Sequence, residues 1–102
     1  MEIESTATNM VILTSDGRGQ PVSKDKNLGF QLKNLIDVES LAKSLDDEFV
    51  VSENAGTNLC NYIYYLGLEN VWTKSHGCIF IHIPHFTKIS LEKQVEHMIN
   101  LI

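Results

Sequence analysis

Basic residues are few in this chain of 102 residues, and they stand singly rather than in clusters. Eight Lys and Arg residues face thirteen Asp and Glu residues, so the formal net charge is −5 when the histidines are neutral. Binding to nucleic acid depends largely on clustered positive charges that neutralise phosphates. We therefore expect no nucleic-acid partner.

Long apolar runs are missing as well. Stretches such as Cys78 to Ile81 are much shorter than the roughly 20 residues that a membrane-spanning helix needs. The N-terminal segment carries Glu2, Glu4 and Asp16, and it has no basic start followed by an apolar run, so it does not resemble a secretory signal. We expect a cytoplasmic protein without a membrane partner.

Cysteine is scarce too, since the chain contains only Cys60 and Cys78. Two cysteines are too few for a disulfide framework, and free thiols are the rule in a reducing compartment. The hydrophobic fraction of 43% and the charged fraction of 21% are ordinary for a soluble globular protein. A chain of this length predicts one domain over residues 1–102.

Apolar patterns divide the chain into alternating strands and helices. Short β-branched runs predict strands at residues 8–13, 49–51 and 78–83. Longer segments with apolar residues three or four apart predict helices at about 30–47, at about 56–66 and after Ser90. Turn-forming residues at 15–21 predict a surface loop.

Two of these helices are defined by particular side chains. The helix at 30–47 rests on the spacing of Leu32, Leu35, Ile36, Val38, Ala42 and Leu45. Ser90 is a suitable N-cap for the last helix. Leu91, Val95, Met98 and Ile102 share one face of that helix, whereas His97 lies off this face and is expected in solvent.

The order strand, helix, strand, helix, strand, helix predicts an α/β fold. We expect a parallel or mostly parallel sheet with helices on its faces, of the three-layer α/β/α type. Three strands are few for such a sheet, and an uncovered strand edge tends to pair with another chain. Association of copies into a homo-oligomer is a consequence that we expect.

Cys60 lies near the start of the second predicted helix, after a short strand. Unpaired N–H groups and the helix dipole favour a thiolate there, and the thiolate is the reactive form of cysteine. The alternative is a structural role, because a free cysteine often packs as a small apolar residue. The position by itself leaves both interpretations open.

His82 lies near the carboxyl end of the last predicted strand, before Pro84. Ligands of parallel α/β sheets bind at the carboxyl ends of strands, so His82 and Cys60 are expected at the same edge. A core histidine bonded to a carbonyl is the alternative. His76, Cys78 and His85 could join His82 around a metal, but their spacing fits no usual zinc pattern, so we expect neither a metal nor a cofactor.

Three segments resemble the pyroglutamyl peptidase I family of cysteine peptidases. Residues 51–65 are similar to its active-site cysteine motif, with Ala55-Gly56, Leu59 and Cys60-Asn61 in place. Residues 79–84 resemble its strand with the catalytic histidine before proline. Residues 3–9 resemble its glutamate motif through Glu4, Ala7 and Asn9, and Asp16, Gly19, Gln20 and Pro21 continue the likeness.

The resemblance implies a Cys60–His82–Glu4 triad that removes an N-terminal pyroglutamyl residue from a peptide substrate. Ser5 stands where the family usually has an arginine, which puts one oxyanion donor in question. The family's first half precedes the glutamate motif, so the resemblance implies that the chain corresponds to the C-terminal catalytic half, truncated at the N-terminus. The alternative function is an inactive truncated homologue that acts as an interaction or structural α/β module.

Overall fold

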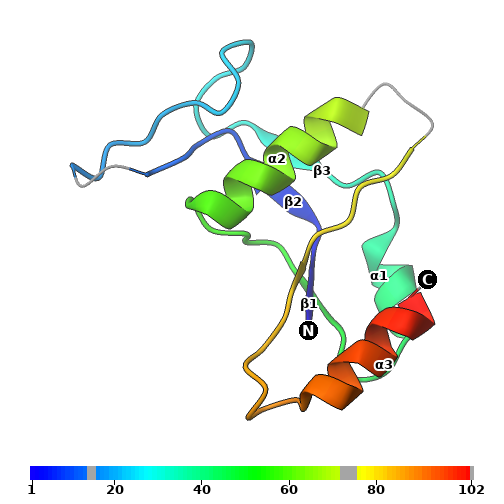
Figure 1. The fold of residues 1–102 in the computed structure, drawn as a ribbon. Coiled ribbons are helices and arrows are strands. Elements are labelled where there is room, and N and C mark those ends of the chain that lie inside the picture. Colours follow the sequence, from blue (N-terminus) through cyan, green and yellow to red (C-terminus); the bar gives the residue numbers. More distant parts are fainter. Residues whose placement is uncertain (14–15, 72–75, 102) are drawn as a thin grey trace.

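The computed structural model describes residues 1–13, 16–71 and 76–101 of the chain. Figure 1 shows the elements in order. The strands are β1 (Glu2–Glu4), β2 (Thr6–Thr8), β3 (Gln31–Lys33), β4 (Val50–Ser52) and β5 (Ile81–His82); the helices are α1 (Val38–Lys43), α2 (Leu59–Val71) and α3 (Leu91–Leu101). From β3 onward strands and helices alternate, as expected for an α/β protein.

β1 is the central strand of a three-stranded mixed sheet, in the order β4-β1-β5. It runs parallel to β4, with Glu2 opposite Val50, and antiparallel to β5, with Glu2 opposite His82. β2 and β3 form a separate antiparallel pair. The predicted α/β class is confirmed, but the third strand does not run parallel to its neighbour. The direction of β5 depends on the path of the segment that connects it to α2. An apolar run in the sequence predicts a strand but not the direction of that strand.

The first predicted strand was placed too far along the chain. β1 and β2 occupy residues 2–8, and of residues 10–13 only Val11 pairs, in an isolated antiparallel bridge with Gln20. Val11 is buried, but Leu13 is 59% exposed. Glu2–Glu4 contains a single apolar residue, so its pairing on both sides is a tertiary effect that local hydrophobicity does not reveal.

The segment predicted as one helix at 30–47 divides into β3 and the short helix α1. Leu32 is buried from β3, whereas Leu35, assigned to the same helical face, is 64% exposed. The Asp37 carboxylate accepts a hydrogen bond from the Ser40 main-chain N–H at 3.1 Å. This N-cap begins the helix at residue 38, because it satisfies a donor that a helix start leaves unpaired.

Buried side chains form two separate clusters. Figure 1 shows α2 crossing β2 and β3, while α1 and α3 lie together at the other end of the molecule. The α2 cluster consists of Ala7, Leu32, Ala55, Tyr64, Tyr65 and Leu68; the second cluster consists of Met1, Ile3, Val38 and Phe49, with Met98 of α3 against it. Side chains alternate along a strand, so Ile3 enters the second cluster while Glu2 and Glu4 point to the opposite face.

α3 begins where the sequence predicts but turns a different face inward. The Ser90 hydroxyl accepts a hydrogen bond from the Lys93 main-chain N–H at 3.3 Å, which confirms the N-cap. His97, expected in solvent, is 4% exposed and bonds to Glu48 Oε1 at 3.0 Å. A partner carboxylate makes the burial of this polar ring favourable, and spacing along one helix gives no information about such a partner.

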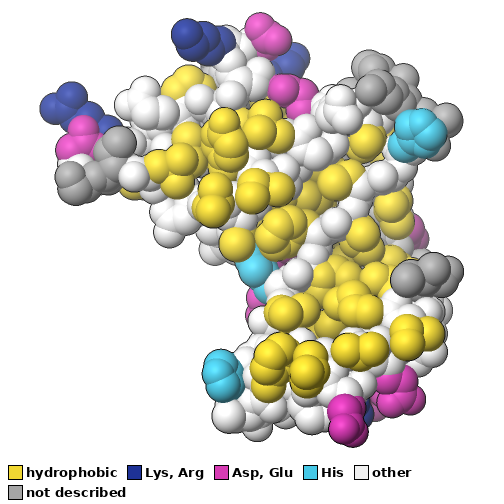
Figure 2. Space-filling view, in the orientation of Figure 1, with side chains coloured by type: hydrophobic (Ala, Val, Ile, Leu, Met, Phe, Trp, Pro, Cys, Tyr) yellow, Lys and Arg dark blue, Asp and Glu magenta, His cyan; other side chains and the backbone are white. Residues whose placement is uncertain are grey.

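The predicted apolar face of α3 is correspondingly exposed. Leu91 and Val95 are 56% and 50% exposed, Met98 is partly buried, and Ile102 lies outside the described residues. Large exposed apolar side chains also occur along α2, at Leu59 and Ile63. Figure 2 shows apolar side chains over both helices on one face of the molecule. In the described part of the chain, no helix has the length and apolar character needed to cross a bilayer.

Asn61, on α2, fixes the position of the helix relative to the N-terminal strands. Its side-chain oxygen accepts a hydrogen bond from the Thr8 N–H at 2.9 Å, and its side-chain nitrogen donates to the carbonyls of Thr8 and Met10 at 2.8 and 3.0 Å. Asn61 is 1% exposed. A buried asparagine that makes three hydrogen bonds therefore holds α2, and Cys60 beside it, against β2.

We predict that Asn61→Ala lowers the free energy of unfolding by about 2–4 kcal/mol, because it leaves buried main-chain groups without partners. Urea denaturation followed by circular dichroism measures the change. Asn100→Ala is the matched control, since Asn100 is an exposed helical residue. Equal stability of the two variants would contradict the anchoring role of Asn61.

Candidate active site

Pairing of β1 with β5 brings two of the three predicted site residues together. His82 lies directly opposite Glu2, and Glu4 is the next residue on the same face of β1. Such diagonal neighbours across an antiparallel pair remain within reach of long side chains. His82 Nδ1 lies 2.9 Å from Glu4 Oε1, at hydrogen-bond distance. The structure therefore brings the Glu4 carboxylate and the His82 imidazole into contact.

Glu4 is completely buried, whereas the His82 side chain is 33% exposed. Glu4 Oε2 is also buried, and no hydrogen-bond partner for it occurs among the described residues. The His82 ring packs edge-on against Phe80, with 5.0 Å between the ring centroids. The pair thus has a buried, rigid acid side and an accessible imidazole side, which is the arrangement that a general base needs.

Tyr64 supports the backbone of Glu4 from α2. Its hydroxyl donates to the Glu4 carbonyl at 2.5 Å and accepts from Asn34 Nδ2 at 3.1 Å. Asn34 Nδ2 also donates to the Cys78 carbonyl at 2.8 Å. Burial raises the pKa of Tyr64 to about 12, although the hydrogen bond from Asn34 acts in the opposite direction. The tyrosine therefore remains a neutral donor over the physiological range.

Cys60 is the second residue of α2 and is exposed. The loop before the helix contains Gly56 at φ +82°, a conformation that side-chain-bearing residues rarely adopt. The Asn54 side chain accepts the Gly56 N–H at 2.9 Å and closes this turn. A thiol in the first turn of a helix lies near unpaired main-chain donors, as predicted. Of the described residues, however, neither His82 nor Glu4 forms a hydrogen bond with the Cys60 thiol.

Ser5, which stands in place of the arginine of the resembling family, has a structural role. Its hydroxyl donates to the Ser52 carbonyl at 3.1 Å, and its N–H donates to the same carbonyl at 2.8 Å. The side chain therefore extends the contact between β1 and β4 and is not free as an oxyanion donor.

Sequence analysis missed Glu2 and Tyr64 as members of this region. Glu2 precedes Glu4 by two residues, and this spacing would have placed both carboxylates on one face once residues 2–4 were recognised as a strand. Tyr64 gave no such signal, because its contact with Glu4 spans 60 residues of sequence. The set His76, Cys78, His82 and His85 does not appear among the groups of potential ligands in the described part of the chain.

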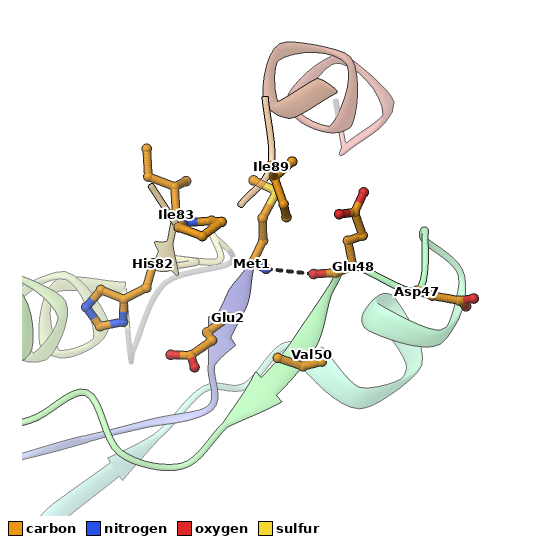
Figure 3. Close-up of a pocket in the computed structure, with 9 residues that line it drawn as sticks. Met1, Glu2, Asp47, Glu48, Val50, His82, Ile83 and Ile89 are labelled. Atoms are coloured by element: carbon orange, nitrogen blue, oxygen red, sulfur yellow. Dashed lines mark hydrogen bonds between the residues drawn. The ribbon is translucent and has the colours of Figure 1, made fainter. Parts of the chain in front are cut away.

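An open cavity of about 470 Å³ adjoins the His82 side of the pair. Figure 3 shows His82 and Glu2 to one side of Met1 and Glu48 to the other, with Ile89 beside Met1. The Met1 ammonium group donates to the Glu48 carbonyl at 2.6 Å. His82 lines this cavity, whereas Cys60 is not among the lining residues.

Comparison with solved structures finds pyrrolidone carboxyl peptidases. The enzyme from Fervidobacterium islandicum aligns with a TM-score of 0.79 and 19% identity, over 98% of this chain and 59% of that chain. A mutant of the Pyrococcus furiosus enzyme aligns with a TM-score of 0.75 and 21% identity, over the same shares. The Thermococcus litoralis enzyme aligns with a TM-score of 0.58 and 25% identity, over 76% of this chain and 40% of that chain.

This chain has the fold of a pyrrolidone carboxyl peptidase fragment. It spans about three fifths of the first two solved chains that it matches. The resemblance inferred from the Cys60, His82 and Glu4 motifs is therefore confirmed at the level of the fold. No family model and no curated protein matches the chain.

The two thiols of this peptidase-like fold are predicted to differ in reactivity. Cys60 is exposed, whereas Cys78 is partly buried and burial raises the pKa of its thiol. At neutral pH we expect iodoacetamide to modify Cys60 roughly tenfold faster than Cys78, because only the thiolate reacts. Peptide mapping by mass spectrometry after timed quenching measures both rates. Faster modification of Cys78 would show that its surroundings are open to solvent.

Burial of Tyr64 predicts a loss of stability at high pH. A tyrosine in the unfolded chain ionises near pH 10, but Tyr64 in the folded protein does so at about 12. Below pH 10 the contribution of the neutral Tyr64 hydroxyl to the free energy of unfolding is fully present. It is lost as the pH rises from 10 through 12. Urea denaturation across this range should show a smaller decrease for Tyr64→Phe than for the unaltered protein. Identical pH dependence of the two proteins would contradict the assignment.

Proposed function

We propose that this chain carries the catalytic residues of a cysteine-type omega-peptidase that removes an N-terminal pyroglutamyl residue from peptides. The observation that carries the proposal is the 2.9 Å contact between His82 and the fully buried Glu4. It occurs in a fold shared with pyrrolidone carboxyl peptidases, which act on this residue according to their name. Cys60, at a helix start in the same fold, is the nucleophile in this proposal.

The reaction follows from the roles of these three side chains. His82 Nε2 takes the proton of the Cys60 thiol, while Glu4 holds Nδ1–H and stabilises the resulting imidazolium. The thiolate sulfur attacks the pyroglutamyl carbonyl carbon, and main-chain N–H groups near the start of α2 stabilise the oxyanion. The imidazolium then protonates the departing amine. Water, deprotonated by His82, cleaves the thioester and releases 5-oxoproline and the free thiol.

The mechanism requires the Cys60 thiol to approach His82, because proton transfer needs hydrogen-bond distance. Catalytic hydrogen bonds are often long without substrate and shorten in the substrate complex. The exposed position of Cys60 leaves its side chain room for this movement. Neither a metal nor a cofactor takes part in the proposed steps, and the two free cysteines suit a cytoplasmic location.

An inactive homologue that serves as an interaction module is the second candidate. Three observations favour it. The Cys60 thiol has no hydrogen bond with His82 in the described structure, and large apolar side chains are exposed along α2 and α3. The chain also matches only 59% of the solved peptidase from Fervidobacterium islandicum. Contiguous apolar surface often marks an interaction site.

Substitution of each cysteine distinguishes the two candidates. We expect Cys60→Ala to lower the rate of hydrolysis of a fluorogenic pyroglutamyl arylamide by roughly three orders of magnitude or more, because the nucleophile is lost. Cys78→Ala is the matched control and should retain the rate, since its thiol lies outside the proposed mechanism. Purified protein that hydrolyses the substrate equally well with Cys60→Ala would refute the nucleophile assignment.

The pH dependence of thiol alkylation separates the candidates even without turnover. A Cys60 activated by His82 should react with iodoacetamide well below pH 8, and it should react more slowly in His82→Asn. An inactive module should show the same alkylation profile with and without the imidazole.

A further inference from the structure

Three potential metal ligands meet at the buried end of the Glu4–His82 pair. Glu2, Glu4 and His82 each offer one ligand atom, and these atoms all lie within 4.8 Å of one another. Strand pairing produces this arrangement, because Glu2 and Glu4 share one face of β1 and His82 faces Glu2 from β5. Figure 3 shows the Glu2 carboxylate and the His82 ring on the same side of β1.

A buried oxygen of Glu4 is a second indication that this cluster binds a ligand. Its side chain is completely inaccessible, and its Oε2 has no hydrogen-bond partner in the part of the chain that the structure describes. Buried carboxylate oxygens are normally paired with donors or cations, because an unpaired buried charge is costly. Both oxygens belong to the same carboxyl group, whose Oε1 contacts His82.

We propose that Glu2, Glu4 and His82 bind a divalent transition-metal ion of the Zn²⁺ type. One imidazole nitrogen with two carboxylate oxygens suits zinc or cobalt, whereas Mg²⁺ and Ca²⁺ prefer oxygen alone. Three protein ligands leave one position of a tetrahedral ion for water. Glu2 is exposed and lines the open cavity together with His82, which provides a path for the ion.

For the Glu4–His82 pair the required rearrangement is small. Ligands about 2.0–2.2 Å from a tetrahedral zinc lie roughly 3.3–3.5 Å apart. The present distance of 2.9 Å between Glu4 Oε1 and His82 Nδ1 must therefore increase by a few tenths of an ångström. The metal replaces the proton that the two atoms share, so binding releases a proton when Nδ1 is protonated.

A second cluster of potential ligands, Asp46, Glu48 and His97, provides an internal comparison. Its Glu48 Oε1 already accepts contacts from Lys93 Nζ and His97 Nε2, each at 3.0 Å. These contacts hold the pKa of Glu48 below its usual range, the His97 hydrogen bond being the largest cause. A metal there would compete with both partners of Glu48. At the Glu4 cluster it would replace one hydrogen bond, between Glu4 Oε1 and His82, while Glu4 Oε2 has no partner in the described structure.

The consequence for catalysis rests on the proposed peptidase function. A metal on His82 Nδ1 takes the place of the Glu4 hydrogen bond that orients the ring and stabilises the imidazolium. The ion would therefore inhibit the triad reversibly, and a chelator would restore it. Binding itself requires no catalytic activity.

Direct titration tests the site separately from catalysis. Co²⁺ is added to purified Cys60→Ala protein, which lacks the exposed thiol but retains all three ligands, and visible absorption and Zn²⁺ calorimetry are recorded. We expect one bound ion per chain, with the intense bands of four- or five-coordinate cobalt. Glu2→Gln should weaken binding at least tenfold, as loss of a direct ligand does. Asp46→Asn is the matched control and should leave the affinity unchanged.

Several results would overturn the proposal. They are absence of a stoichiometric ion, equal affinity in Glu2→Gln, or loss of binding in Asp46→Asn, which would assign the ion to the other cluster. Circular dichroism verifies that each variant is folded, and His82→Asn gives a second ligand substitution if Glu2→Gln fails to fold. Metal binding without any peptidase activity would refute the proposed function alone. Peptidase activity that Zn²⁺ does not alter would refute the inhibitory role.

Discussion

β1 lies between β4 and β5, and hydrogen bonds on both edges hold its three residues in register. Glu2 contacts neighbours on both sides, opposite Val50 and opposite His82. A slip of one residue would reverse the faces of the strand. Glu4 would then enter the apolar cluster of Ile3, and the imidazole would lose its carboxylate. The candidate site therefore depends on a short central strand that is itself rich in charge.

Burial of Glu4 connects the two proposals. A carboxylate without solvent contact is costly unless it is paired, and His82 satisfies one of its two oxygens. In the proposed peptidase mechanism this pairing orients the imidazole and stabilises the positive charge that it gains during the reaction. The remaining oxygen has no partner in the described part of the chain and is suited to a cation. The same burial that makes Glu4 a good partner for His82 thus makes the pair sensitive to metal ions.

The surface around the site differs from that of a closed enzyme pocket. Leu59 and Ile63 flank Cys60 on α2 and are more than half exposed. The Fervidobacterium islandicum peptidase aligns over 59% of its length, so two fifths of that chain have no counterpart in this sequence. The comparison agrees with the exposed apolar side chains of α2 and α3, which lack covering structure in the part of the chain described.

Local sequence patterns were sufficient to predict the elements that are stabilised mainly by contacts between residues close in the sequence. The strand predicted at 49–51 is β4, shifted by one residue, and the helix predicted at about 56–66 is α2 at Leu59–Val71. The Ser90 cap placed the start of α3. These elements were predicted because β-branched runs, helical spacing and a capping hydroxyl act over a few residues. The motifs also point to Glu4 and His82, whose side chains lie 2.9 Å apart in the structure. Ordering along the chain was sufficient for the α/β class, since alternating strands and helices have few ways to pack.

Only the tertiary structure decided the strand at Glu2–Glu4, the antiparallel direction of β5 and the burial of His97. Each depends on a partner far away in sequence: Val50 and His82 for the strand, and Glu48 for the histidine. The division of residues 30–47 has the same cause, because β3 forms by pairing with β2. Sequence determined which groups could do chemistry, whereas long-range pairing determined that Glu4 meets His82 while Cys60 stays exposed without a hydrogen bond to it.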